Sequence, residues 1–227
     1  MEVTIIRHGE SRNNVGETLE LDSVLTEHGE NQAELTGLRL GAEAKRIAPF
    51  THALVSPFRR TLQTFRPIQH ETGVSAEVCP EICEYCDVRE DSFRDSYRNF
   101  IGQTREQVDH EYPHVDTSNM PTGPKRWWPS PLEDTFAIRA RAARVASALR
   151  ARYGDTDARL LIVSHAETIG RLVEALMGWE PADNAPLTGN CGIWRIATGS
   201  SPSTATLMLR NSREHLAILE LTGTTSR

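Results

Sequence analysis

Four side chains that could handle a phosphate group follow short apolar runs of the sequence: Arg7, His8, Arg60 and His165. The planar guanidinium of arginine matches phosphate oxygens in pairs, and a neutral imidazole can act as a nucleophile. A single residue of this kind is more often structural or solvated. If the fold brings the four together, they form a small cationic pocket that suits a phosphate.

The elements that must position these residues are short strands and long amphipathic helices. Apolar runs predict strands at 2–6, 52–55, 160–164 and 191–197, with weaker candidates at 204–209 and 216–219. Helical periodicity predicts helices over 27–48, 57–72, 132–153 and 167–177. This alternation predicts an α/β fold, a three-layer α/β/α sandwich with a mainly parallel sheet. In such sheets ligands bind beyond the carboxyl ends of the strands, where these side chains stand.

The helix predicted at 132–153 places its apolar side chains on one face and ends at Gly154. Its arginines are expected to point mostly away from that face: Arg139, Arg141, Arg144, Arg150 and Arg152. In the helix at 57–72, only one of the neighbouring arginines Arg59 and Arg60 should face the pocket. Gln63 and Thr64 are interpreted equally well as packing and capping residues.

Residues 85–131 break the alternation, because they contain few aliphatic residues and a stretch rich in proline, glycine and tryptophan. We interpret this segment as an insertion that forms a lid over the strand ends, or as a surface excursion packed by its own aromatic residues. Its cations could contact a second anionic group, and its tryptophans could stack on a base or sugar. The candidate substrate contacts are Arg89, Lys125, Arg126 and Trp128.

Charge and composition limit the partners of this chain. The 227 residues contain 25 Lys and Arg against 31 Asp and Glu, a formal net charge of −6. We therefore expect no nucleic-acid and no membrane partner. No run approaches the about 18 apolar residues of a membrane span, and the N-terminal sequence lacks a signal-peptide pattern, so we expect a cytoplasmic protein.

Three clustered cysteines raise the question of a metal: Cys79, Cys83 and Cys86. Their spacing is compatible with an iron–sulfur cluster held by three thiolates. It is also compatible with a structural zinc that uses one further ligand from His70, His110 or His114. No second Cys-x-x-Cys pair and no glycine-rich cofactor motif accompany the cluster, so we expect reduced thiols, no metal and no cofactor.

Four motifs occur in an order that resembles the histidine phosphatase superfamily, in its phosphoglycerate-mutase-like branch. They are RHGES at 7–11, LTEHGENQA at 25–33, SPFRRTLQT at 56–64 and VSH at 163–165. Asn14 and Asn190 are also similar to family positions. The resemblance spans residues 5 to about 195 and implies a single domain over 1–227, with the insertion at about 85–131.

The resemblance implies a role for each residue of the pocket. His8 would accept the phosphoryl group on a ring nitrogen. The phosphate oxygens would be held by Arg7, Arg60, His165 and Asn14. The family spacing places its arginine four residues after the serine of the SPFRRTLQT motif, which selects Arg60 and leaves Arg59 solvated. The chemistry agrees, because phosphoryl transfer requires mainly positioning and positive charge, which these groups supply without a metal.

The leaving alcohol needs a proton, and the resemblance favours Glu84 as the acid. Glu81 and Asp87 are the alternatives, because the residues after Glu84 differ from the family pattern. The chain also lacks the arginine–histidine–tyrosine–glycine continuation of the mutases, which favours a phosphatase acting on a small phosphorylated metabolite. Phosphoglycerate-mutase-type transfer and a non-catalytic phosphate-binding protein remain the alternatives. A second copy of the chain, in a homodimer, is a further expected partner.

Overall fold

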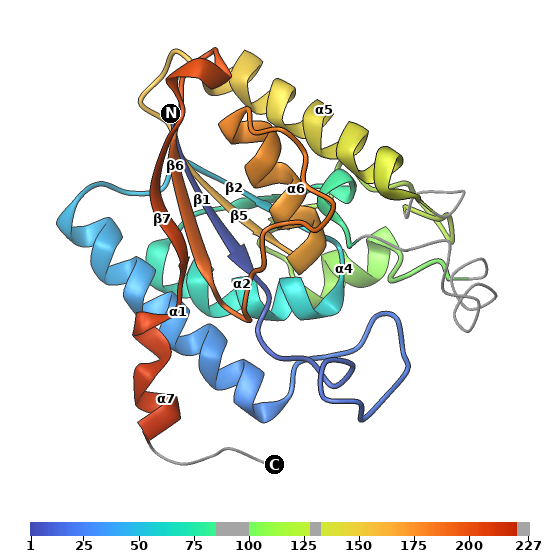
Figure 1. Cartoon of the computed structure of the whole chain (residues 1–227). Coiled ribbons are helices and arrows are strands. Elements are labelled where there is room, and N and C mark those ends of the chain that lie inside the picture. The colour runs from blue at the N-terminus through green and yellow to red at the C-terminus, as the bar shows by residue number, and fades with distance from the viewer. Residues whose placement is uncertain (85–99, 128–132, 222–227) are drawn as a thin grey trace.

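The computed structural model describes residues 1–84, 100–127 and 133–221, and these residues build a sheet of seven strands (Figure 1). The order across the sheet is β4-β3-β2-β5-β1-β6-β7. The strands are β1 Glu2–Arg7, β2 His52–Val55, β3 Ala76–Val78, β4 Val115–Asp116, β5 Arg159–Ser164, β6 Ile193–Ala197 and β7 Thr206–Ser212. β1 to β5 pair in parallel, whereas β6 pairs antiparallel with both β1 and β7.

Helices cover both faces of the sheet. The α-helices are α1 Glu27–Arg46, α2 Arg59–Thr72, α4 Arg105–Glu111, α5 Thr135–Tyr153, α6 Ala166–Met177 and α7 Ala217–Leu221. Short 3-10 turns are η1 Pro80–Ile82, η3 Pro202–Thr204 and η4 Glu214–Leu216. α1 and α2 lie on one face of the sheet, and α5 and α6 lie on the other (Figure 1). The predicted three-layer α/β/α sandwich with a mainly parallel sheet is therefore confirmed.

Each strand contributes to two apolar cores because successive side chains point to opposite faces. In β5, Leu161 and Val163 pack with the residues of α1 and α2, whereas Leu160 and Ile162 pack with those of α5 and α6. This burial on both faces explains the continuous apolar run of the sequence. The central strands are thereby fixed, and their carboxyl ends can hold side chains in defined positions.

Three parts of the fold differ from the sequence predictions. Residues 216–219 are not a strand but the turn η4 and the start of α7, with Leu216 buried against the core and Ile218 exposed. β3 was not predicted, since three residues are too few to show a period. The segment 85–131 also contains α4 and the strand β4, and β4 extends the sheet by pairing with β3.

Among the described residues, no helix combines the length and the apolar content that a membrane crossing requires. The longest helix of that part of the chain, α1, has acidic residues in its first turn and basic residues in its last turn. These charges complement the helix dipole.

Candidate active site

His8 follows the last residue of β1 and is buried. Its Nδ1 lies 2.7 Å from the carbonyl oxygen of Gly9, which can only accept, so the ring proton is on Nδ1. Nε2 therefore carries a lone pair, and the Nε–H of Arg60 points at it from 3.2 Å. Burial, and then the charges of Arg60 and Arg7, lower the pKa of His8 well below its usual value. The imidazole is held neutral, in the tautomer whose Nε2 lone pair faces Arg60.

His165 lies beside His8, with the ring centroids 5.2 Å apart. It precedes the first residue of α6, and its Nε2 lies 2.8 Å from the hydroxyl oxygen of Ser56. Its Nδ1 is buried and has no hydrogen-bond partner among the described residues. Burial, followed by the charge of Arg60, lowers the pKa of His165 well below its usual value. The structure thus brings the two predicted histidines into one site.

The two predicted arginines approach this pair of rings from different elements. Arg60, in the first turn of α2, also donates from Nη1 to the carbonyl oxygen of Leu21 at 2.9 Å. Arg7 ends β1 and donates from Nη1 to the carbonyl oxygen of Thr188 at 2.8 Å. Burial lowers the pKa of Arg7, although the nearby charge of Glu84 opposes this change. The site therefore combines two cations with two neutral imidazoles.

The loop after β1 is held close to the two helices that begin at the site. The Oγ1 of Thr64 accepts from the backbone N–H of Gly9 at 3.0 Å. A Cβ on Gly29 would stand 1.9 Å from the carbonyl oxygen of Glu10, so a side chain at this position of α1 has no room. The close contact between the loop and α1 thus requires glycine.

Two asparagines lie at the rim of the site. The Nδ2 of Asn190 donates to the carbonyl oxygen of His8 and to Oδ1 of Asn14, both at 3.1 Å. Asn14 is exposed, and its Oδ1 also accepts from the backbone N–H of Ser11 at 3.2 Å. The predicted contact of Asn14 with a phosphate remains a prediction, since its observed partners are other protein groups.

Glu84 is half-buried at the edge of the site. Its Oε1 lies 3.4 Å from the hydroxyl oxygen of Thr168. Glu81, by contrast, is exposed and pairs with Arg144 at 3.3 Å. Of these two carboxyl groups, Glu84 is the one whose charge acts on Arg7. Asp87, the other alternative, lies outside the described residues.

Arg141 is the exception to the prediction that the arginines of α5 point mostly away from its apolar face. It is buried, forms a paired salt bridge with Glu133, and donates to backbone carbonyl groups beside Glu84. The helical period contained the signal, because Arg141 lies between the buried residues Ile138 and Ala142 of the apolar face. The sequence analysis assigned no role to Ser56, which begins the SPFRRTLQT motif, or to Thr168, which lies three residues after the VSH motif.

Aromatic residues form one wall of the site. The ring of Phe58 lies 5.0 Å from the ring of His165, and the guanidinium of Arg60 lies 4.3 Å from the centroid of Phe58. Phe100 and Trp127 pack on Phe58 at centroid distances of 5.9 and 5.2 Å. The Nε1 of Trp127 donates to a backbone carbonyl oxygen at 2.9 Å. Residues of the predicted insertion therefore contact the ring that covers the histidine.

A groove of about 810 Å³ opens next to this wall. It is lined by residues 18–22, Arg59, residues 100–103 and Gln107, with apolar and polar groups interspersed. Asp22 in this groove accepts a hydrogen bond from the backbone N–H of Arg59 at 2.7 Å. Burial raises the pKa of Asp22 to about 6. Arg59 is half-buried, and its Nε has no partner among the described residues, so it is less solvated than predicted.

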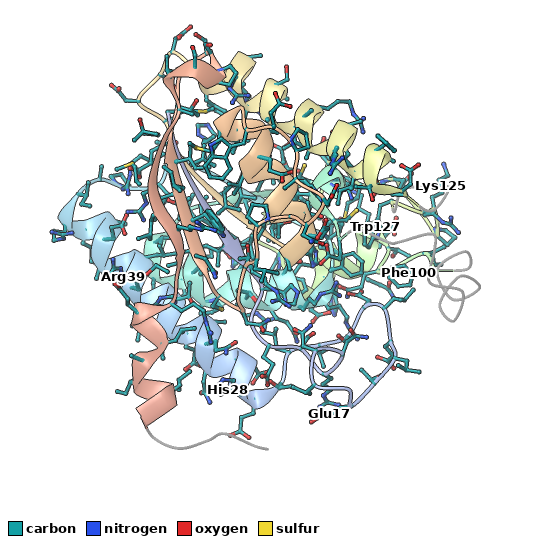
Figure 2. The ribbon with its side chains drawn as sticks, in the orientation of Figure 1. Glu17, His28, Arg39, Phe100, Lys125 and Trp127 are labelled. Carbon is teal, nitrogen blue, oxygen red and sulfur yellow. The ribbon has the colours of Figure 1, made fainter. Side chains whose placement is uncertain are left out.

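The predicted substrate contacts of the insertion are only partly visible. Lys125 is exposed and points outward, on the same side of the molecule as Phe100 and Trp127 (Figure 2). Arg126 is half-buried. Two further candidates lie outside the described residues: Arg89 and Trp128.

The cysteines do not form a metal site in the described part of the chain. There, no group of three His, Cys, Asp or Glu side chains stands close enough to bind a metal ion. Burial raises the pKa of Cys79 to about 11 and that of Cys83 to about 12, which keeps both thiols protonated. Cys86 lies outside the described residues, and the histidines suggested as zinc ligands are exposed: His70, His110 and His114.

The histidines and arginines that follow β1, β2 and β5 thus form one cationic site at the carboxyl edge of the sheet of an α/β/α sandwich. The family model described as histidine phosphatase superfamily (branch 1) matches residues 3–208, so the chain belongs to this superfamily.

Its relatives carry the names of both mutases and phosphatases. The protein named "Probable phosphoglycerate mutase GpmB" of Photorhabdus laumondii is 28% identical over 211 residues, covering 89% of this chain and 87% of that protein. The protein of the same name from Enterobacter sp. (strain 638) is 29% identical over 206 residues, with the same coverage.

Solved structures share the fold at lower identity. A mycobacterial glucosyl-3-phosphoglycerate phosphatase in complex with VO3 matches with a TM-score of 0.62 at 22% identity, covering 93% of this chain and 99% of that chain. The Entamoeba histolytica phosphoserine phosphatase in complex with 3-phosphoglyceric acid matches with a TM-score of 0.60 at 19% identity, covering 95% and 98%.

Proposed function

We propose that this protein is a phosphatase that hydrolyses a small phosphorylated metabolite through a phosphohistidine intermediate on His8. The observation that carries the proposal is the state of the His8 ring. Its proton is held on Nδ1 by the Gly9 carbonyl oxygen, and its Nε2 faces the guanidinium of Arg60. A neutral nucleophile beside fixed cations is what attack on a phosphate anion requires.

In the first step, Nε2 of His8 forms a bond to phosphorus while the bond from phosphorus to the leaving oxygen breaks. The carboxyl group of Glu84 gives its proton to that oxygen, so the product leaves as an alcohol. Arg7, Arg60 and His165 stabilise the charge on the phosphoryl oxygens. His165 offers its buried Nδ1, which has no partner in the described structure.

In the second step, a water oxygen attacks the phosphorus and the bond to Nε2 of His8 breaks. The carboxylate of Glu84 accepts a proton from that water, which restores the acid form. The products are inorganic phosphate and the enzyme in its starting state. The same carboxyl group thus acts first as an acid and then as a base.

Hydrolysis and mutase transfer differ in what occupies the space beside His8. The groove of about 810 Å³ beside the aromatic wall is lined by none of the proposed catalytic residues, so it would contact only a part of the substrate that extends away from the phosphate. The names of the curated relatives favour the alternative, in which the phosphoryl group returns to another hydroxyl of the same substrate. The sequence after Glu84 favours hydrolysis, because it lacks the mutase continuation.

A screen of phosphorylated metabolites that records both phosphate release and product isomers separates the two reactions. A phosphatase releases inorganic phosphate in proportion to substrate loss, whereas a mutase yields an isomer with little phosphate. The candidate substrates should include phosphoglycerates, phosphoserine and a generic aryl phosphate. Isomer formation without phosphate release would refute hydrolysis.

Replacement of the nucleophile tests the intermediate itself. His8→Ala should abolish both turnover and phosphorylation of the protein, because it removes the ring nitrogen that takes the phosphoryl group from the substrate. Wild-type protein should yield an acid-labile, base-stable phosphate adduct in single-turnover experiments, and vanadate should inhibit it. Full activity of His8→Ala would refute the mechanism. A stable adduct that never releases phosphate would instead indicate the non-catalytic binding protein.

The leaving-group dependence tests the acid. Glu84→Gln should lose much more rate with phenyl phosphate than with 4-nitrophenyl phosphate, since only the poor leaving group needs the proton. Glu81→Gln is the matched control, because that carboxylate is exposed and paired with Arg144. An equal loss with both substrates in Glu84→Gln would remove Glu84 from the role of acid.

A further inference from the structure

We propose that Arg141 and Thr168 are positioning residues that hold the backbone before Glu84, so that its carboxyl group is aimed at the leaving oxygen. This inference rests on the proposed function, since it concerns the geometry of the proposed acid. The two residues come from different helices, α5 and α6, and neither lies next to Glu84 in the chain.

Three consecutive carbonyl groups that precede Glu84 are each held by a buried side chain. Nη1 of Arg141 donates to the carbonyl oxygen of Glu81 at 2.6 Å and to that of Cys83 at 3.0 Å. The hydroxyl group of Ser164 donates to the carbonyl oxygen of Ile82 at 2.7 Å. The segment 81–83 is therefore anchored through its backbone, independently of its own side chains.

Thr168 connects this anchor to the carboxyl group itself. Its hydroxyl group donates to the carbonyl oxygen of Cys83 at 2.7 Å. The Oγ1 of Thr168 also lies 3.4 Å from Oε1 of Glu84. Thr168 is buried in the first turn of α6, the helix that begins directly after His165. The proposed acid and the second histidine are thus attached to one helix N-terminus.

The guanidinium of Arg141 is itself fixed by Glu133. Nε donates to Oε1 at 2.7 Å and Nη2 donates to Oε2 at 2.5 Å, so the two groups meet as planar forks. Both side chains are buried. A buried ion pair is often replaceable by apolar residues without loss of stability, so its contribution here is better sought in geometry.

A displaced Glu84 carboxyl group would slow one step, the proton transfer to the leaving oxygen. General acid catalysis requires the proton donor within hydrogen-bond reach of the leaving oxygen. A loop after a three-residue 3-10 turn has few internal constraints, and a displacement of about 1 Å can cost on the order of a hundredfold in rate. The loss should appear only where the proton is needed, with poor leaving groups.

The experiment compares Thr168→Val with Thr168→Ser, because valine keeps the shape without the hydroxyl group and serine restores the hydroxyl group. Rates of phosphate release are measured with phenyl phosphate and 4-nitrophenyl phosphate. Thr168→Val should lose about tenfold or more with phenyl phosphate and little with 4-nitrophenyl phosphate, as a smaller version of Glu84→Gln. Thr168→Ser should recover most of the phenyl phosphate rate.

A second variant avoids the unpaired buried charge that a single change of Arg141 would leave. The double variant Glu133→Leu with Arg141→Met removes both charges and the two carbonyl contacts, and circular dichroism verifies its fold. It should show the same selective loss with phenyl phosphate. Arg144→Gln, which breaks only the exposed pair with Glu81, is the matched control and should leave both rates unchanged.

Equal losses with both leaving groups in Thr168→Val and in the double variant would overturn the proposal, because they would indicate a structural role. Unchanged rates in both variants would also overturn it. These outcomes are distinct from a failure of the proposed function. In that case His8→Ala would remain active, or Glu84→Gln would show no leaving-group dependence.

Discussion

Asp22 offers a prediction whose sign and size follow from its surroundings. Its carboxylate accepts a hydrogen bond from the N–H of Arg59 and faces the charges of Arg59 and Arg60. Burial nevertheless dominates and raises its pKa from 3.8 to about 6. The ionised form is therefore less favourable in the folded protein than in the unfolded chain.

The change Asp22→Asn removes this ionisation while keeping an oxygen for the Arg59 N–H. Because the folded pKa lies above the unfolded value, the contribution of Asp22 to stability is fully present below pH 3.8 and is lost as pH rises through about 6. A shift of about two pKa units corresponds to roughly 3 kcal/mol. Solvent reaches part of this half-buried side chain, so we expect about 1–2 kcal/mol.

Urea unfolding of the wild type and Asp22→Asn at several pH values between 3.5 and 7.5 measures the effect. The free energy of unfolding of the variant should rise relative to that of the wild type by about 1–2 kcal/mol across this range. Near neutral pH the variant should also melt higher, by about 2–4 °C for each kcal/mol in a protein of this size.

The pH dependence of the stability difference between the wild type and Asp22→Asn tests the raised pKa of Asp22. A difference between the two proteins that stays constant with pH would show that Asp22 titrates normally. A variant that loses stability relative to the wild type as pH rises would show that the arginines outweigh burial, with the folded pKa below 3.8. Asp155→Asn is a control, because this carboxylate is exposed.

Three further predictions concern the site and its walls. The rate of His8 phosphorylation in single-turnover experiments should not fall as pH drops through 6.5, because burial and Arg60 lower the pKa of His8 well below that value. A half-maximal rate near pH 6.5 that follows His8 ionisation would contradict this. Gly29→Ala should lower the free energy of unfolding, measured in urea, by about 1–3 kcal/mol, since the new methyl group overlaps the carbonyl group of Glu10. An unchanged unfolding midpoint would mean that the loop can move away. Trp127→Ala should cost about 3–5 kcal/mol by the same assay, because it leaves a cavity against the other rings of the aromatic wall. A loss below about 1 kcal/mol would show that the ring contributes little to folding.

The sequence allowed the centre of the site to be predicted because parallel strands share an edge. His8 and His165 follow the neighbouring strands β1 and β5, and Arg60 lies in the helix after β2, next in the sheet. The period of the apolar runs was sufficient to find these strands. The meeting of their ends is then a property of parallel sheets, independent of the detailed packing.

The residues around this centre could not be predicted as well, because their state depends on distant partners. An arginine in a helix is solvated by default, and Arg141 is buried only because Glu133 and the carbonyl groups of 81–83 surround it. The unusual pKa of Asp22 likewise depends on burial by other segments.

Short elements could not be predicted from the sequence for a different reason. β4 contains two residues and is defined by its pairing with β3 rather than by a pattern of its own. The apolar run at 216–219 has too few residues to distinguish a strand from a helix by period. It is helical because Leu216 reaches the core while its neighbours remain in water.

The position of β1 in the sheet has a consequence for how the protein folds during its synthesis. β1 is made first, yet it pairs with β5 and β6, which lie near the other end of the chain. During synthesis on the ribosome, β1, which directly precedes the proposed nucleophile His8, can therefore pair only after most of the polypeptide has emerged. Pairing between segments so far apart is slow, and an unpaired apolar strand is prone to aggregate. Catalytic competence should therefore appear late in folding, together with the closing of the sheet centre.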